Sequence, residues 1–203
     1  MRSMFKDACI LFAITLIAGI LLGGVYQITK DPIARQEELA KANACKEVFA
    51  DAAEFEQDPG FEPDGSTPVH NMLYPGETID NCQKALSDGG DLLGYVLTVT
   101  THEGYGGDIR FMMGIRNDGT LNGISLLSIS ETAGLGMQAE EVLVPQFAGK
   151  NAAEFKYTKD GATSDSEIDA ISGATITTNA VTNGVNAGLS YFHSILSPEE
   201  GGE

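Results

Sequence analysis

Basic residues are scarce in this chain of 203 residues. It holds 12 lysines and arginines against 29 aspartates and glutamates, which gives a formal net charge of -17 at pH 7. Residues 1–35 have a net charge of +2, so the remainder carries -19. Nucleic acids and anionic lipid headgroups repel such a polyanion, so nucleic-acid binding and peripheral lipid binding are disfavoured. The acidity fits a soluble, exported domain, and solubility is its simplest interpretation.

Cysteines are scarce as well. Cys9, Cys45 and Cys82 form no C-x-x-C pair, and with the three histidines they make no four-ligand zinc set, so we expect no metal site. Cys45 and Cys82 could pair in an oxidising compartment, and the sequence leaves this open. The sequence also lacks a nucleophile–histidine–acid set and a G-x-G-x-x-G loop, so we expect no catalytic residues and no NAD site.

An uncharged, apolar run lies near the N-terminus. Residues 9–28 read CILFAITLIAGILLGGVYQI, and 20 residues are enough for a helix to cross a hydrocarbon core of about 30 Å. A cleaved signal peptide is the rival interpretation, but its apolar region is only about 7–15 residues long and precedes an A-x-A-like site. We therefore expect a retained transmembrane helix with its stop at Lys30-Asp31-Pro32.

The positive-inside count does not decide the orientation of this span. A short N-terminal tail and a long acidic domain behind the span are compatible with translocation of the domain, because long domains cross largely regardless of charge. We therefore expect a single-pass protein of the cell membrane with its soluble domain on the extracytoplasmic side.

The soluble part begins with a helical pattern. Residues 33–57 lack glycine and proline and place apolar residues near helical spacing, which predicts an amphipathic helix leaving the membrane. Residues 58–91 mix proline, glycine, aspartate and asparagine with little periodicity, which indicates a loop-rich stretch.

The second half predicts an antiparallel sheet followed by a helix. Residues 92–101, 109–116 and 121–129 are runs rich in β-branched or aromatic residues, with an Asn-Asp-Gly turn between the last two. Residues 177–196 show helical spacing, and the glycines on the same face, Gly184 and Gly188, indicate close packing of the helix against the sheet. The expected fold class is α+β.

A stretch of small residues, DAISGATIT at 169–177, precedes this last helix. Free N–H groups and the positive end of the helix dipole favour an anion at such a turn, and the hydroxyls of Ser172, Thr175 and Thr177 add donors. The stretch is also typical of an ordinary helix N-cap with small residues for packing, and the residues alone leave both interpretations open.

The pattern D-x-x-S-G-A-T-x-T resembles the sequence that flavin transferases recognise in FMN-binding domains, where the threonine of S-G-A-T accepts the phosphate of FMN from FAD. By this resemblance FMN is covalently esterified to Thr175. Two further stretches match the same family: G-Y-G-G at 104–107, and E-T-A-G-L-G at 131–136 with Ala133 where a proline is common. The remaining cofactor-binding residues that the resemblance implies are Ser172, Gly173, Ala174, Thr177, Glu131, Thr132, Gly134, Leu135, Gly136 and Tyr105. The E-T-A-G-L-G stretch is also typical of a simple turn between a strand and a helix.

With the anchor and the order of these motifs, the chain is similar to the G subunits of Rnf ion-translocating ferredoxin:NAD oxidoreductase complexes. It is also similar to the C subunits of sodium-translocating NADH:quinone oxidoreductases, which are typically longer between anchor and flavin domain. The resemblance implies an electron carrier that passes electrons between an iron-sulfur or flavin centre and a neighbouring membrane flavin protein of the complex. It further implies the other Rnf components as partners, and a flavin transferase during maturation. The coupling ion and the direction of electron flow stay open.

The alternative from a different class is a non-redox, anchored assembly module in which S-G-A-T only caps the helix. A sensor flavoprotein is a third interpretation, for which we see no appended signalling segment. The organisation that we expect is a tail at residues 1–8, a transmembrane helix at 9–28, a membrane-proximal helix at 29–57, an FMN-binding domain at 58–197 and an acidic tail at 198–203.

Overall fold

The structure is a computed structural model that describes residues 2–61 and 73–196. The chain divides into two compact units, Met1–Ala40 and Lys41–Glu203. The acidic tail expected at residues 198–203 lies outside the described residues, and so does part of the stretch expected to be rich in loops.

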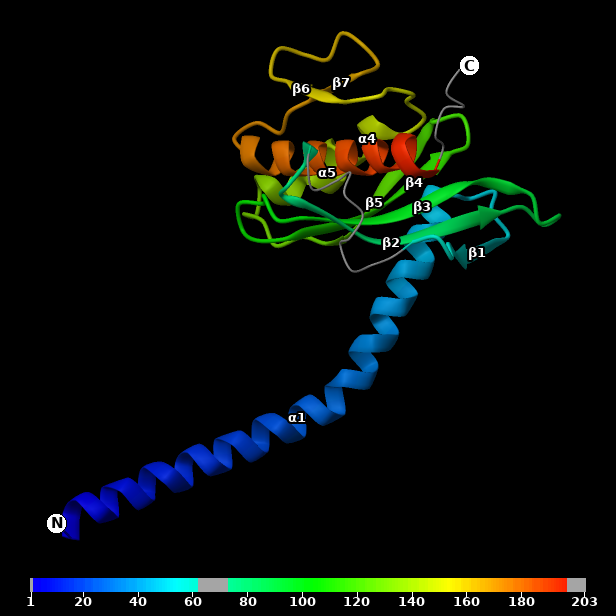
Figure 1. Ribbon diagram of the computed structural model, residues 1–203. Helices are drawn as coiled ribbons and strands as arrows, with labels where there is room; N and C mark the ends of the chain where they lie inside the picture. Colours follow the sequence, from blue (N-terminus) through cyan, green and yellow to red (C-terminus); the bar gives the residue numbers. More distant parts are fainter. Residues whose placement is uncertain (1, 62–72, 197–203) are drawn as a thin grey trace. The chain divides into compact units, whose positions relative to one another are not determined.

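One long helix forms the first unit and enters the second. Helix α1 runs from Arg2 to Val48 without interruption (Figure 1). Among the described residues it is the one helix that is long and apolar enough to cross a membrane. The helix end expected at Pro32 is wrong, because this proline lies inside α1. A proline removes one backbone hydrogen bond and crowds the preceding turn, and residues with good helix propensity on both sides carry the helix past it.

The membrane-proximal helix expected to reach residue 57 is the continuation of α1 and ends earlier, at Val48. The Phe49 N–H still donates to the Cys45 carbonyl, and strand β1 (Glu54–Gln57) then pairs with the next strand. Residues 49–57 keep apolar residues near helical spacing and contain no breaker, so the local sequence does not mark this boundary. Sheet pairing overrides the local helix propensity.

The second unit is built on a five-stranded antiparallel sheet in the order β1-β2-β3-β4-β5. Three strands expected from the sequence are confirmed: β3 (Leu92–Thr101), β4 (Ile109–Arg116) and β5 (Leu121–Ser128). The expected turn between the last two is confirmed too. The Gly119 N–H donates to the Arg116 carbonyl at 2.9 Å, and Gly119 has a φ of +83°.

Strand β2 (Glu77–Leu86) lies in the stretch that we expected to be rich in loops. Its pairing with β3 shifts register between Ile79 and Asn81, so the buried residues Ile79, Cys82 and Ala85 recur every third position. A bulge of this kind breaks the alternation by which a strand is recognised in a sequence. The sequence pattern therefore missed a central strand.

Helices cover one face of the sheet (Figure 1). The expected C-terminal helix is confirmed as α5 (Thr175–Tyr191), which continues into a π-helical turn, η2 (Phe192–Leu196). The segment between β5 and α5 forms the elements η1 (Gly136–Gln138), α3 (Ala139–Val142), α4 (Val144–Phe147), β6 (Lys156–Thr158) and β7 (Glu167–Asp169), of which the last two pair in parallel. The expected α+β class is confirmed.

Two hydrophobic clusters lie on opposite faces of the sheet and separate the two buried cysteines. Cys82 belongs to the larger cluster, between the sheet and α5, whereas Cys45 belongs to the smaller one, where the end of α1 packs. Both thiols are free. Burial raises the pKa of both, that of Cys82 to about 12, so neither is a reactive thiolate.

The close packing expected for the two α5 glycines is confirmed. A Cβ added to Gly184 would lie 2.9 Å from the Phe111 ring, and one added to Gly188 would overlap the sulfur of Met113. Both neighbours are fully buried side chains of β4. The glycines therefore let the axis of α5 lie close to the sheet.

Candidate functional site

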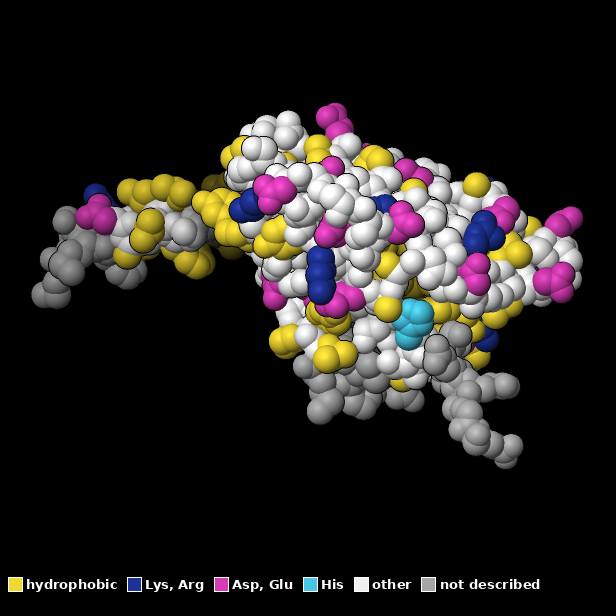
Figure 2. Space-filling view, turned by 90° about the horizontal axis from the view of Figure 1, so that it is seen from above, with side chains coloured by type: hydrophobic (Ala, Val, Ile, Leu, Met, Phe, Trp, Pro, Cys, Tyr) yellow, Lys and Arg dark blue, Asp and Glu magenta, His cyan; other side chains and the backbone are white. Residues whose placement is uncertain are grey.

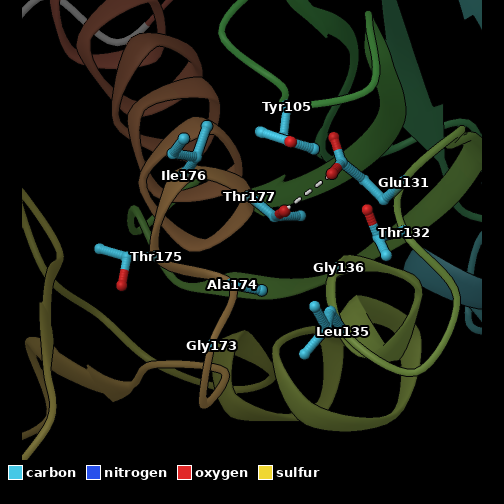
Figure 3. Close-up of a pocket in the computed structure, with 10 residues that line it drawn as sticks. All are labelled: Tyr105, Glu131, Thr132, Leu135, Gly136, Gly173, Ala174, Thr175, Ile176 and Thr177. Atoms are coloured by element: carbon cyan, nitrogen blue, oxygen red, sulfur yellow. Dashed lines mark hydrogen bonds between the residues drawn. The ribbon is translucent and has the colours of Figure 1, made fainter.

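A pocket of about 540 Å³ lies where three segments meet (Figure 3). These segments are the loop after β3, the loop after β5 and the start of α5. The residues that line it are Tyr105, Glu131, Thr132, Leu135, Gly136, Gly173, Ala174, Thr175, Ile176 and Thr177.

The pocket brings together nine of the eleven residues that the sequence singled out. Ser172 and Gly134 do not line it, whereas Ile176 does and was missed. In the sequence Ile176 belongs to the apolar stripe of α5 and reads as a packing residue. The signal that would have found it is its place at the first turn of the helix, where its side chain is 52% exposed.

The S-G-A-T turn is tight and tied to the helix that follows it. The Ala174 N–H donates to the Ile171 carbonyl, and Gly173 has a φ of +78°, a conformation that residues with a Cβ rarely adopt. The Thr178 hydroxyl donates to the Ala174 carbonyl at 2.9 Å and accepts the Ile171 N–H at 3.1 Å. These contacts fix the position of Thr175, the first residue of α5.

The N-terminus of α5 has no side-chain cap. Its N-cap residue is Ala174, which offers no acceptor atom. Within the described part of the chain we find no hydrogen-bond partner for the backbone N–H of Thr175, Ile176 or Thr177, and none for the Thr175 hydroxyl. The structure therefore gives the α5 N-terminus no capping hydroxyl, and the small residues of the stretch form the tight turn before the helix. Three N–H donors and the positive end of a helix of 17 residues stay available to an anion.

Glu131 lies on the far side of the pocket and joins two other segments. Its Oε2 accepts the Thr177 hydroxyl at 3.0 Å, and its Oε1 accepts the Gly106 N–H at 3.1 Å. Figure 3 shows the Thr175 hydroxyl pointing away from this carboxylate. The acceptor threonine and Glu131 thus occupy different parts of the site.

The remaining wall is apolar and open to solvent. Tyr105, Leu135 and Ile176 line it from the three separate segments, and all three side chains are exposed. Large exposed apolar side chains around a pocket are typical of a surface that takes a flat, partly apolar ligand.

The pocket is lined by one charged side chain, the carboxylate of Glu131, and by no lysine or arginine among the described residues. Figure 2 shows both acidic side chains and lysine or arginine side chains on the face in view. An anionic ligand would therefore be held by backbone N–H groups and not by a cationic side chain. The free N–H groups at the helix end and the apolar wall are compatible with a ligand that has both an anionic group and a flat, partly apolar part, as FMN has.

The loop that carries Tyr105 is also held at its base. His102 is exposed and lies within hydrogen-bonding distance of Thr78 (3.1 Å) and Asp108 (2.9 Å). It does not line the pocket.

Similarity to known proteins spans the whole chain. The family model of the FMN-binding domain matches residues 104–190, and that of the RnfG N-terminal region matches residues 1–48. The chain is 32% identical to the G subunit of the Na(+)-translocating ferredoxin:NAD(+) oxidoreductase complex of Acetobacterium woodii, over 96% of this chain and 94% of the relative. It is 30% identical to the G subunit of the ion-translocating oxidoreductase complex of Methanosarcina acetivorans, over 98% of both chains. A crystal structure of Shewanella oneidensis NqrC matches at 17% identity with a TM-score of 0.48, over 73% of this chain and 84% of that one.

Proposed function

The chain belongs to the G subunits of ion-translocating oxidoreductase complexes, and from this premise we propose that it carries FMN covalently on Thr175. As a member of that family it is an electron-carrying, FMN-binding component of a multisubunit Rnf ferredoxin:NAD oxidoreductase. The other components of that complex are its partners.

One observation carries the assignment of Thr175. It is the first residue of a helix that has no side-chain cap and opens onto the pocket, with a hydroxyl that makes no hydrogen bond within the described residues. A non-redox assembly module in which S-G-A-T merely caps α5 has no support here, because the N-cap position holds an alanine.

Bound FMN supplies the redox chemistry, and the residues of the chain bind it, orient it and tune its surroundings. The free N–H groups at the start of α5 would hold the phosphodiester. Tyr105, Leu135 and Ile176 would shield one part of the ring system from water. No proton transfer by a side chain is needed, which agrees with the expectation of a site without catalytic residues.

Attachment requires a flavin transferase. The Thr175 oxygen would bond to the FMN-side phosphorus of FAD, the P–O bond from that phosphorus to the bridging oxygen would break, and AMP would leave with that oxygen. The hydroxyl proton would pass to a base of the transferase. A half-buried hydroxyl without a hydrogen-bond partner is a suitable acceptor, because no hydrogen bond within the described residues has to break first.

We expect Thr175→Ala to lose covalent flavin and ferredoxin-dependent NAD reduction while the chain stays folded in the membrane. Because the hydroxyl makes no hydrogen bond within the described residues, its loss should change the free energy of unfolding by less than about 0.5 kcal/mol. The measurements are intact mass, in-gel flavin fluorescence and membrane abundance. Thr175→Ser, which keeps the hydroxyl, is the matched control and should retain flavin.

Peptide mapping identifies the modified residue. Flavin found on Ser172, Thr177 or Thr178 with Thr175 unmodified would contradict the assignment. Full electron transfer in a chain without flavin would contradict the role as a carrier.

A further inference from the structure

The carboxylate of Glu131 is shared between two segments that are far apart in sequence. Thr177, at the start of α5, is 46 residues away, and Gly106, in the loop after β3, is 25 residues away. Glu131 itself lies in the loop after β5. One side chain therefore contacts all three segments that form the pocket.

Glycines around this carboxylate make the contact possible. A Cβ on Gly136 would lie 2.8 Å from Glu131 Oε2 and 2.6 Å from the Thr177 hydroxyl. A Cβ on Gly104 would lie 2.9 Å from Glu131 Oε1. The glycines of both loops thus leave room for the carboxylate to reach its two partners.

The loop that carries Tyr105 depends on this contact. Among the described residues, the bond from the Gly106 N–H to Glu131 is the one hydrogen bond that ties residues 104–107 to the rest of the protein. The side chain of Tyr105 is 71% exposed, so packing does little to hold it. Without Glu131, no hydrogen bond from the described residues would keep this part of the pocket wall in place.

We propose that Glu131 is a positioning residue, which joins the three walls of the pocket and acts on the flavin through them. The sequence predicted a direct flavin contact. Each carboxylate oxygen already accepts one hydrogen bond from the protein, so Glu131 has a role in joining the walls that does not depend on a flavin contact. The proposal rests on the proposed function only for the identity of the ligand, because the contacts exist within the chain itself.

The test is amide hydrogen exchange on the detergent-solubilised full chain, prepared without flavin transferase so that no flavin is attached. We expect Glu131→Ala to speed exchange at Gly106 and at Thr178, the first hydrogen-bonded amide of α5. The expected increase is about tenfold at Gly106. This corresponds to about 1.4 kcal/mol and lies within the range for the net contribution of one hydrogen bond to an uncharged acceptor, which glutamine can replace.

Further variants test whether the effect of Glu131→Ala comes from the lost hydrogen bonds, from the lost charge or from a general loss of fold. Glu131→Gln should exchange like the wild type, because its carbonyl can accept the Gly106 N–H and its amide can donate to the Thr177 oxygen. Glu140→Ala removes an exposed acid of α3 that makes no hydrogen bond among the described residues, and it should change nothing. Thr177→Val should loosen the start of α5 and leave Gly106 protected, whereas Thr177→Ser should not.

The flavin-loaded chain gives the second readout. Glu131→Ala should keep covalent flavin by intact mass, yet its flavin should show lower fluorescence anisotropy and stronger quenching by iodide than the wild type and Glu131→Gln. The proposal would be overturned if amide exchange in Glu131→Ala were unchanged. It would also be overturned if Glu131→Gln exchanged as fast as Glu131→Ala. Absence of covalent flavin in the wild type would instead overturn the proposed function, and the exchange result would stand.

Discussion

Gly173 shows how one backbone conformation presents the acceptor threonine. Its φ of +78° turns the chain into α5, and a Cβ there would lie 3.1 Å from a methyl group of Leu135, which lines the pocket. A side chain at Gly173 would therefore strain the backbone and press on the pocket wall together. The strain of a left-handed conformation alone is about 1–2 kcal/mol.

We expect Gly173→Ala to lower both the free energy of unfolding and the fraction of chains that carry flavin. Gly90→Ala is the matched control, because Gly90 has a φ of +82° with nothing within 4 Å of its Cβ position. Chemical denaturation should show the same loss of stability in the control. Its intact mass should show full flavin occupancy. Equal flavin loss in both variants would show that flavin occupancy depends only on the overall stability of the protein.

Glu77 is a buried acid outside the pocket, between the sheet and α5. It is 3% exposed; its Oε1 accepts the Thr101 hydroxyl at 3.1 Å, and its Oε2 has no partner among the described residues. Burial raises the pKa of Glu77 to about 8, and the nearby carboxylate of Glu103 adds to the shift. The other neighbours, the Phe111 ring and Gly184, carry no charge.

The raised pKa makes stability depend on pH. Above a pH of about 4.5 the unfolded chain has released a proton that folded Glu77 still holds, so the free energy of unfolding falls as pH rises toward about 8 and then levels off. Glu77→Gln removes this titration. We expect the variant to be more stable than the wild type near pH 8 and to show a flatter dependence below it, measured by thermal unfolding of the full chain in detergent. Parallel curves for the two proteins would mean that the carboxyl does not titrate from a buried state.

Single residues also mark the limit of sequence reasoning about the site. Most of the pocket residues were predicted from the resemblance of the three motifs to FMN-binding domains, because small residues and hydroxyls before a helix are equally typical of an ordinary N-cap. The role of Glu131 was not predictable in this way. It depends on Gly106 and Thr177, which only the folded sheet brings within reach.

At the scale of elements, α5 sets the distance between the pocket and the sheet. Gly184→Ala would gain up to about 1 kcal/mol of helix propensity but would press a methyl group on the buried Phe111 ring, and overpacking of this kind costs about 1–3 kcal/mol. We therefore expect a net loss in the free energy of unfolding, measured by urea denaturation. Adding Phe111→Leu should recover part of it. A more stable Gly184→Ala would show that the ring can move aside.

An element could be predicted from the sequence when the pattern that marks it lies within its own residues. Strands β3, β4 and β5 are runs rich in β-branched or aromatic residues bounded by glycines, and helix α5 has helical spacing, so the sequence predicted all four within a few residues. Strand β2 was missed because of its bulge, and the end of α1 was misplaced because β1 forms only by pairing with β2. The parallel pair of β6 and β7 is too short to show any period.

At the scale of the whole molecule, the side of the membrane decides which proteins the soluble unit can meet. We propose that the unit Lys41–Glu203 lies on the extracytoplasmic side, as expected from the short N-terminal tail and the acidic domain behind the span. Protease added to right-side-out vesicles should then digest this unit and leave a fragment that holds the apolar part of α1. Digestion only after the membrane is permeabilised would place the unit in the cytoplasm.

The alanine at the start of α5 has a consequence for how the protein matures. The helix end has no side-chain cap, so before flavin attachment its first N–H groups stay free at the residue that the proposed transferase must reach. In the proposed product the phosphodiester oxygens would accept hydrogen bonds from these N–H groups and complete the first turn. Attachment of the cofactor would then also be the last step in building this helix end.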